Sequence, residues 1–201
     1  MTTISAEHAD VSRKPRAAIS WSGGKDSCAA LGRARESFDV VAMVTMFDEE
    51  AARSRSHGLR PEVLASDGIA HVIFGDILFD EHRRWAEGTC APHGITAVEP
   101  LWGSSTEALF EDWIASGADA VIVTALAEFL DQTWLGRRLD RDLLPEFARL
   151  GVDPCGERGE YHTVVMNTPL FDRPLHLRSG GHVQRSGCWA MDVTVDDAGG
   201  Y

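Results

Sequence analysis

Short apolar runs alternate with amphipathic segments over the first two thirds of the chain. Each run has the length of a buried strand; the runs are residues 16–21, 38–47, 69–77 and 118–126. The segments between them carry apolar side chains at helical spacing; they are residues 25–37, 60–68, 79–94 and 105–117. This alternation predicts a parallel α/β sheet with right-handed crossovers and flanking helices. The nearly continuous run 38–47 predicts a central strand covered on both faces.

The pattern changes after residue 128. A helix is expected at 141–151, followed from residue 160 by short strands between glycine- and proline-containing turns. We therefore expect three parts: a flexible leader at 1–15, an α/β domain at 16–128, and a C-terminal β-rich region at 129–201 packed on that domain.

Composition narrows the class of protein. The 201 residues are 44% hydrophobic and carry a net charge of −12, which disfavours binding to DNA or another polyanion. The four cysteines form no Cys-x-x-Cys pair, as expected for reduced thiols in the cytoplasm. The longest apolar stretch, 118–127, is too short to span a bilayer, and the first fifteen residues lack the apolar core of a signal peptide. We expect a cytoplasmic protein without membrane attachment.

The sequence Ser-Gly-Gly-Lys-Asp-Ser at 22–27 joins the first expected strand to the first expected helix. Ligands of open parallel sheets bind beyond the carboxyl ends of the strands, and a helix N-terminus favours anions. Two glycines allow close approach of the backbone, Lys25 supplies a positive charge, and Ser22 and Ser27 supply hydroxyl groups. The stretch matches neither the Walker A spacing nor the dinucleotide fingerprint. It suits phosphate or pyrophosphate.

A second polar stretch, Gly-Glu-Arg-Gly-Glu-Tyr-His-Thr, occupies residues 156–163. If residues 160–165 form a strand, Glu160 and His162 project to one face, with Glu157 just before them. Such a group can bind a metal, accept a proton or position an amine. The same spacing also fits the polar edge of an ordinary strand.

The first stretch resembles the PP-loop of N-type ATP pyrophosphatases, which split ATP between its α and β phosphates. The second resembles a signature of the diphthine–ammonia ligase family, and the likeness continues in order through residues 53–64, 74–77, 100–102, 134–140 and 168–171. In eukaryotes and archaea that family amidates diphthine, a modified histidine carboxylate on translation elongation factor 2. Some bacterial homologues have been linked to cobalamin-related amidation.

The resemblance implies a Rossmann-like fold of the HUP type and a two-step amide synthesis with ATP and magnesium. A carboxylate-bearing acceptor, elongation factor 2 where diphthamide is made, would be adenylated with release of pyrophosphate, and ammonia would then displace AMP. The expected catalytic residues are Lys25, Asp76, Glu157, Glu160 and His162, with Asp26 and Asp76 near magnesium. The expected nucleotide-binding residues are Ser20, Ser22, Gly23, Gly24, Lys25, Asp26, Ser27, Thr45, Met46 and Gly75. The expected substrate-binding residues are His57, Trp102, Gly136, Arg137, Gly156 and Gly159.

The chain departs from the family pattern at two places. Ser66 runs directly into Asp67 and Gly68, where the family usually has a further strand and helix, and Arg158 replaces a residue that is often asparagine. Two other functions stay open: a tRNA-modifying PP-loop enzyme, which the negative charge disfavours, and a non-catalytic adenine-nucleotide sensor. The oligomeric state also stays open, with a homodimer allowed.

Overall fold

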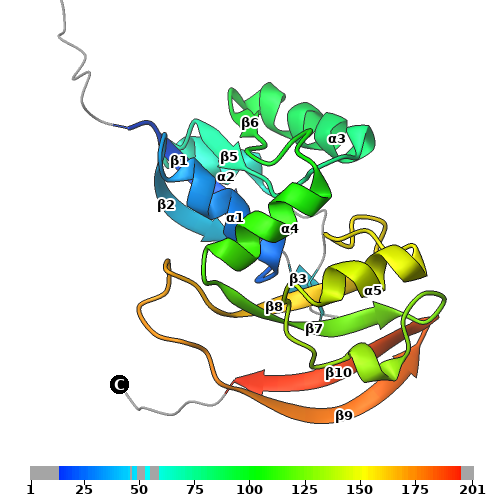
Figure 1. Cartoon of the computed structure of the whole chain (residues 1–201). Helices are drawn as coiled ribbons and strands as arrows, with labels where there is room; N and C mark the ends of the chain where they lie inside the picture. Colours follow the sequence, from blue (N-terminus) through cyan, green and yellow to red (C-terminus); the bar gives the residue numbers. More distant parts are fainter. Residues whose placement is uncertain (1–13, 46, 49–52, 55–58, 196–201) are drawn as a thin grey trace, which may run out of the picture.

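The computed structural model describes residues 14–45, 47–48, 53–54 and 59–195, and it contains two main sheets (Figure 1). The first sheet has the order β2-β1-β5-β6, and each pair of neighbours is parallel. Its strands are β1 (Arg16–Ser20), β2 (Asp39–Val44), β5 (His71–Ile73) and β6 (Thr96–Val98). The predicted Rossmann-like parallel sheet is therefore confirmed. The short strand β6 was not predicted.

Helices cover both faces of this parallel sheet (Figure 1). They are α1 (Lys25–Ala34), α2 (Pro61–Ser66), α3 (Asp80–Cys90) with the 3-10 turn η1 (Ala91–His93), and α4 (Thr106–Ala115). Successive residues of β1 point to opposite faces: Ile19 packs with Leu31 of α1, whereas Ala18 packs in a separate cluster with Leu64 of α2. The helix α4 starts as its sequence predicts, because Ser105 Oγ accepts a hydrogen bond from the Ala108 amide at 3.3 Å.

The second sheet is antiparallel, with the order β8-β7-β10-β9. Its strands are β7 (Asp119–Leu126), β8 (Tyr161–Asn167), β9 (Leu177–Arg185) and β10 (Cys188–Val195). The helix α5 (Leu143–Leu150) and the 3-10 turn η2 (Gln132–Trp134) pack against it. Its apolar core includes Phe110 of α4, Ile122 of β7 and Phe147 of α5, so α4 contacts this core as well as the parallel sheet. The expected C-terminal β-rich region is present.

Two sequence predictions about strand placement were wrong. The strand predicted at 118–126 is β7, which pairs with β8 and β10 and belongs to the antiparallel sheet. The strand predicted at 38–47 is β2, which lies first in the sheet order, and Met43 on it is 55% exposed. A continuous apolar run therefore did not mark a central strand in this case.

The passage from α2 to β5 is direct. Gly68 has φ +71°, and the Ile69 amide donates to the carbonyl of Leu64 at 3.0 Å, so the chain turns immediately after α2 and enters β5. This agrees with the prediction that the chain lacks one strand–helix unit of the family pattern near residues 66–67. A small antiparallel pair, β3 (Phe47–Asp48) and β4 (Arg53–Ser54), precedes α2. No helix within the described ranges is long and apolar enough to cross a membrane.

Candidate active site

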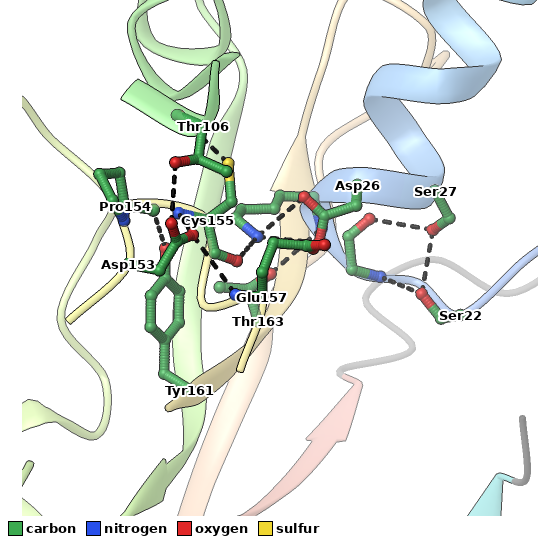
Figure 2. Close-up of polar contacts among 12 residues, drawn as sticks. Ser22, Asp26, Ser27, Thr106, Asp153, Pro154, Cys155, Glu157, Tyr161 and Thr163 are labelled. Atoms are coloured by element: carbon green, nitrogen blue, oxygen red, sulfur yellow. Dashed lines mark hydrogen bonds and ion pairs between the residues drawn. The ribbon is translucent and has the colours of Figure 1, made fainter. Parts of the chain in front are cut away.

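The six residues 22–27, called the glycine loop below, follow the carboxyl end of β1 and form the start of α1 (Figure 1). Gly23 has φ +79°, a conformation that favours glycine. The Ser22 hydroxyl accepts a hydrogen bond from the Gly24 amide at 3.3 Å and lies 3.1 Å from the Ser27 hydroxyl (Figure 2). Ser27 Oγ also donates to the carbonyl of Gly24 at 3.0 Å. The serines therefore hold the loop in a defined turn at a helix N-terminus.

Strand β8 supports the glycine loop from the second sheet. The Val165 amide donates to the carbonyl of Gly23 at 3.0 Å, and the Lys25 amide donates to Thr163 Oγ1 at 3.1 Å. A Cβ atom at Gly24 would lie 3.3 Å from the carbonyl oxygen of Thr163. The two motifs recognised in the sequence therefore contact each other. Thr163 is a site residue that the sequence reasoning passed over, although it is the last residue of the second motif.

Gly75 supports the same loop from the parallel sheet. A Cβ atom at Gly75 would lie 2.9 Å from the carbonyl carbon of Asp26 and 3.0 Å from the amide nitrogen of Ser27. This separation is too short for any side chain, so glycine is required where the segment after β5 packs on the first turn of α1. Gly75 was predicted to bind nucleotide. The structure places it directly against the loop backbone.

Lys25 lies at the centre of these contacts and is 4% exposed. Its Nζ donates to both carboxylate oxygens of Asp26 at 2.8 Å and to the backbone carbonyl of Cys155 (Figure 2). Nζ also lies 5.3 Å from the centre of the Tyr161 ring. Burial alone would lower the pKa of Lys25, but the charges of Asp26, Cys155 and Glu157 and the hydrogen bond to Asp26 together outweigh burial, and the pKa is raised above its ordinary 10.5. Lys25 is therefore held as a buried cation.

Residues 153–160, called the acidic loop below, are shaped by the fully buried carboxylate of Glu160. Glu160 Oε1 accepts a hydrogen bond from the Asp153 amide at 3.0 Å, and Oε2 accepts one from the Arg158 amide at 2.9 Å. Gly156 and Gly159 have φ values of +68° and +81° in the turns between these contacts. Glu160 and the two glycines were predicted in the site, and the structure gives all three a part in the conformation of the acidic loop.

Glu157 of the acidic loop has a side chain that interacts electrostatically with the glycine loop. Burial and the nearby carboxylate of Asp26 raise the pKa of Glu157 to about 7, although Lys25 opposes the shift. Asp153 and Asp76 raise it further. A carboxyl group with this pKa exchanges a proton near neutral pH, as a general base must.

His162 lies on β8 between the buried residues Tyr161 and Thr163, and its own side chain is exposed. Partial removal from water and the positive charge of Lys25 lower its pKa below 6.5, although Asp26 opposes the shift. His162 is therefore a mainly neutral imidazole close to the glycine loop. The predicted shared face of Glu160 and His162 was wrong, because β8 begins only at Tyr161 and Glu160 belongs to the preceding turn.

The carboxyl ends of β5 and β6 carry two further carboxyl groups. Asp76 Oδ1 lies 3.0 Å from Nδ1 of His82. Glu99, which the sequence reasoning missed, follows β6 and has a side chain that is 6% exposed. Burial and the nearby Asp76 raise the pKa of Glu99 to about 7, with Arg83 opposing the shift. Asp76 therefore influences both Glu157 and Glu99.

The remaining predicted residues have different surroundings. Ser20 ends β1, and Thr45 Oγ1 donates to the carbonyl of Trp21 at 2.9 Å. The Trp102 ring lies 5.0 Å from the guanidinium carbon of Arg83. Met46 and His57 lie outside the described residues.

Arg137 belongs to an aromatic column that leads away from the glycine loop. Its guanidinium lies 4.1 Å from the Trp134 ring, and it forms two hydrogen bonds with Glu146. Trp134 stacks on Phe147 at 5.4 Å between ring centres, and Phe147 stacks on Tyr161 at 5.3 Å. The preceding Gly136 has φ +81° and donates its amide to the carbonyl of Ile122. Arg137 is therefore connected to Lys25 through this column, by way of Tyr161.

The described side chains do not form a protein-only metal site. In residues 14–45, 47–48, 53–54 and 59–195, no group of three or more histidine, cysteine, aspartate or glutamate side chains is arranged to hold a metal ion. Both oxygens of Asp26 already accept hydrogen bonds from Lys25. Magnesium coordinated by these side chains alone does not fit this arrangement.

Comparison with known proteins identifies two matching family models. One is described as the diphthamide synthase N-terminal domain and matches residues 15–68. The other is described as the diphthamide synthase C-terminal domain and matches residues 105–194. Together they contain both the glycine loop and the acidic loop.

Curated relatives carry the same kind of name. The chain is 33% identical over 128 residues to a diphthine–ammonia ligase of Mus musculus, covering 62% of this chain and 48% of the relative. It is 31% identical over 121 residues to a diphthine–ammonia ligase of Homo sapiens, covering 58% and 45%. For a diphthine–ammonia ligase of Schizosaccharomyces pombe the identity is 32% over 118 residues, covering 57% and 20%. The alignments thus span less than half the length of these relatives.

Proposed function

Because the chain belongs to the diphthamide synthase family, we propose that it is an ATP-dependent ligase that joins ammonia to a substrate carboxylate. The observation that carries this proposal is the connection made by Lys25. This residue starts α1 in the glycine loop and bonds to the backbone of the acidic loop at Cys155. A phosphate-binding turn and a proton-accepting carboxyl group therefore belong to one site.

The glycine loop suits the phosphates of ATP. The N-terminal turn of α1 offers amide groups and the positive end of the helix dipole, and Gly23 leaves the approach to the backbone open, since a Cβ there would meet no atom within 4 Å. Asp26 takes up part of the Lys25 charge while no phosphate is bound. A phosphate group would compete with Asp26 for Lys25.

The reaction we propose has two steps. An oxygen of the acceptor carboxylate forms a bond to the α-phosphorus of ATP, and the bond from that phosphorus to the pyrophosphate oxygen breaks. Ammonia then forms a bond to the acyl carbon, and the bond from that carbon to the AMP oxygen breaks. Lys25 and the loop amides stabilise the charge that develops on pyrophosphate, which is the main form of help in phosphoryl transfer.

Glu157 is suited to proton transfer in the second step. Nitrogen that has attacked the acyl carbon carries a positive charge and must lose a proton before AMP leaves. Glu157, with a pKa of about 7, accepts a proton at neutral pH and lies within the electrostatic reach of Lys25 and Asp26. The neutral imidazole of His162 is a neighbouring hydrogen-bonding group. Glu160 acts on this step only by holding the acidic loop.

Magnesium would reach the site with the ATP phosphates, where it neutralises their charge, because it commonly takes only one or two ligands from protein. No step of the proposed reaction is routed through the metal.

The proposal is tested with elongation factor 2 that carries diphthine as the acceptor. The protein is incubated with this acceptor, ATP and ammonium chloride, and mass spectrometry of the acceptor measures replacement of the carboxyl hydroxyl by an amino group. Amide formation that requires both ATP and ammonium supports the proposal. Amidation that fails although ATP binds would contradict ligase activity toward this acceptor. A second, small-molecule carboxylate pool then tests the wider ligase class.

A further inference from the structure

Glu99 has a buried oxygen with no partner among the described residues. Its side chain is 6% exposed, and Oε1 accepts no hydrogen bond from any of them. Its other oxygen, Oε2, lies 3.5 Å from Nε of Arg83. A buried carboxyl oxygen without a hydrogen bond lowers the stability of the folded protein. A bound donor from outside the described part of the chain would remove this cost.

The groups around Glu99 favour a cationic donor. Asp76 lies close enough to raise the pKa of Glu99, and Glu87 adds a third negative charge. Among the described residues, Arg83 is the cation that acts on Glu99, and it also bonds to Glu87 at 3.0 Å and lies over the ring of Trp102. Arg83 therefore neutralises two carboxyl groups with a single charge, and a small cation at Glu99 Oε1 would offset the repulsion from Asp76.

We propose that Glu99 binds the ammonium ion that supplies the amide nitrogen, through its buried oxygen Oε1. This inference rests on the proposed function and names where one of its substrates binds. Ammonium fits better than a divalent metal, because its N–H groups satisfy a lone oxygen such as Glu99 Oε1. The described residues bring together no group of three or more histidine, cysteine, aspartate or glutamate side chains that could hold a metal ion here.

The position also suits the chemistry. Forming an amide from ammonium removes two protons from nitrogen, one before the attack and one after it. Glu99 takes the first, so that its carboxylate becomes a carboxylic acid and ammonium becomes ammonia with a free lone pair. Glu157 takes the second after the C–N bond has formed. Asp76 acts electrostatically on both carboxyl groups and thus links the ammonium site to the acidic loop.

A binding experiment tests the site without any acceptor. The full chain is labelled with carbon-13 in its glutamate carboxyl groups, and the Glu99 resonance is assigned with the variant Glu99→Gln. Ammonium chloride should shift this resonance, whereas potassium chloride at the same concentration, which offers a similar ion without N–H donors, should not. An equal response to potassium, a response only to magnesium chloride, or no response to ammonium would each overturn the proposal.

A kinetic experiment tests the role in amide formation. Glu99→Gln should raise the KM for ammonium about tenfold to hundredfold, as expected for loss of a hydrogen bond to a charged group, and should also lower kcat, because glutamine cannot take the first proton. Glu87→Gln, an exposed change beside the same Arg83, should stay within about twofold.

Hydroxylamine separates binding of ammonium from a structural role of Glu99. It is neutral at pH 7 and should bypass the cation site, so Glu99→Gln should keep its rate of hydroxamate formation. Equal losses with ammonium and hydroxylamine would show that Glu99 only supports the fold, and would overturn the inference. If the unmodified protein amidates no acceptor, the proposed function fails, and the carbon-13 experiment still decides whether ammonium binds.

Discussion

Lys25 donates a hydrogen bond from Nζ to the backbone carbonyl of Cys155, 130 residues further along the chain. The bond joins the first turn of α1 to the acidic loop and lies close to the aromatic ring of Tyr161 (Figure 2). It makes the glycine loop and the acidic loop neighbours. Any ligand that draws Lys25 toward itself therefore also acts on the loop that holds Glu157.

Replacing Lys25 by methionine keeps the apolar stem and removes the charge. The change leaves Asp26 and the carbonyl of Cys155 without their shared donor, so the free energy of unfolding should fall by about 2–3 kcal/mol. ATP affinity should fall at least about tenfold with loss of a charge that faces phosphate. Urea denaturation and calorimetric titration with ATP measure the two effects.

The only other lysine of the sequence, Lys14, provides the matched control. It is exposed and donates to the carbonyl of Arg35, far from the acidic loop in sequence. Lys14→Met should change stability by no more than about 0.5 kcal/mol and leave ATP binding as it is. ATP affinity that survived Lys25→Met would refute the assignment of the glycine loop to phosphate.

Glu160 and Glu157 should respond differently to the same substitution. In Glu160→Gln, an amide NH2 group replaces one of the two carboxylate oxygens that accept backbone hydrogen bonds. Two donors then face each other, and the free energy of unfolding should fall by about 2 kcal/mol. Glu157→Gln should be at least as stable as the original and should lose amide formation. Urea denaturation at pH 7 compares them. A Glu160→Gln protein of full stability but no activity would instead restore Glu160 as a catalytic residue.

Stability should fall as the pH rises toward neutrality. The pKa values of Glu157 and Glu99 are raised from 4.5 to about 7, so the folded protein binds these two protons more tightly than the unfolded chain does. Their contribution to the free energy of unfolding is therefore present below pH 4.5, is lost between 4.5 and about 7, and stays absent above that.

Denaturation at a series of pH values measures this loss. The double variant Glu99→Gln, Glu157→Gln should remove most of the fall across this interval. The same slope in the variant and the original would mean that neither carboxyl group has a raised pKa. Amide formation should show the opposite trend and increase through about pH 7, because the base form of Glu157 is the active one.

Two glycine-to-alanine changes test the packing behind the glycine loop. Gly75→Ala places a Cβ 2.9 Å from the backbone of Asp26, so the first turn of α1 must shift and ATP affinity should fall about tenfold or more. Gly88 lies within α3, where an added Cβ would meet no atom within 4 Å, and Gly88→Ala should stabilise the protein by about 0.5–1 kcal/mol. Calorimetric titration compares the ATP affinities of the two variants. Equal affinities of Gly75→Ala and Gly88→Ala would show that the glycine loop tolerates the shift.

Local signals in the sequence predicted local structure well. The glycine loop and the capped start of α4 depend on residues a few positions apart, and both form as expected. The partner of β7 depends on distant segments instead. Its apolar run suits the interior of either sheet, so the sequence did not reveal that it pairs with β8.

Prediction of the candidate site was limited in the same way, because it depends on contacts between distant segments. Glu160 was assigned to a strand face, but β8 starts one residue later, so alternation along the strand does not apply to it. Glu99 was missed because β6 has only three residues and leaves no recognisable period. Its importance comes from burial beside Asp76, which brings together segments that no single motif contains.

The most direct test of the ligase mechanism follows oxygen atoms through the reaction. Diphthine-bearing elongation factor 2 is labelled with oxygen-18 in the acceptor carboxylate and incubated with the protein, ATP and ammonium chloride, and the AMP is analysed by mass spectrometry. Attack of the carboxylate on the α-phosphorus predicts AMP that carries one oxygen-18 atom for each amide formed. Unlabelled AMP, or ADP in place of AMP, would contradict an acyl-adenylate at the junction of the glycine and acidic loops.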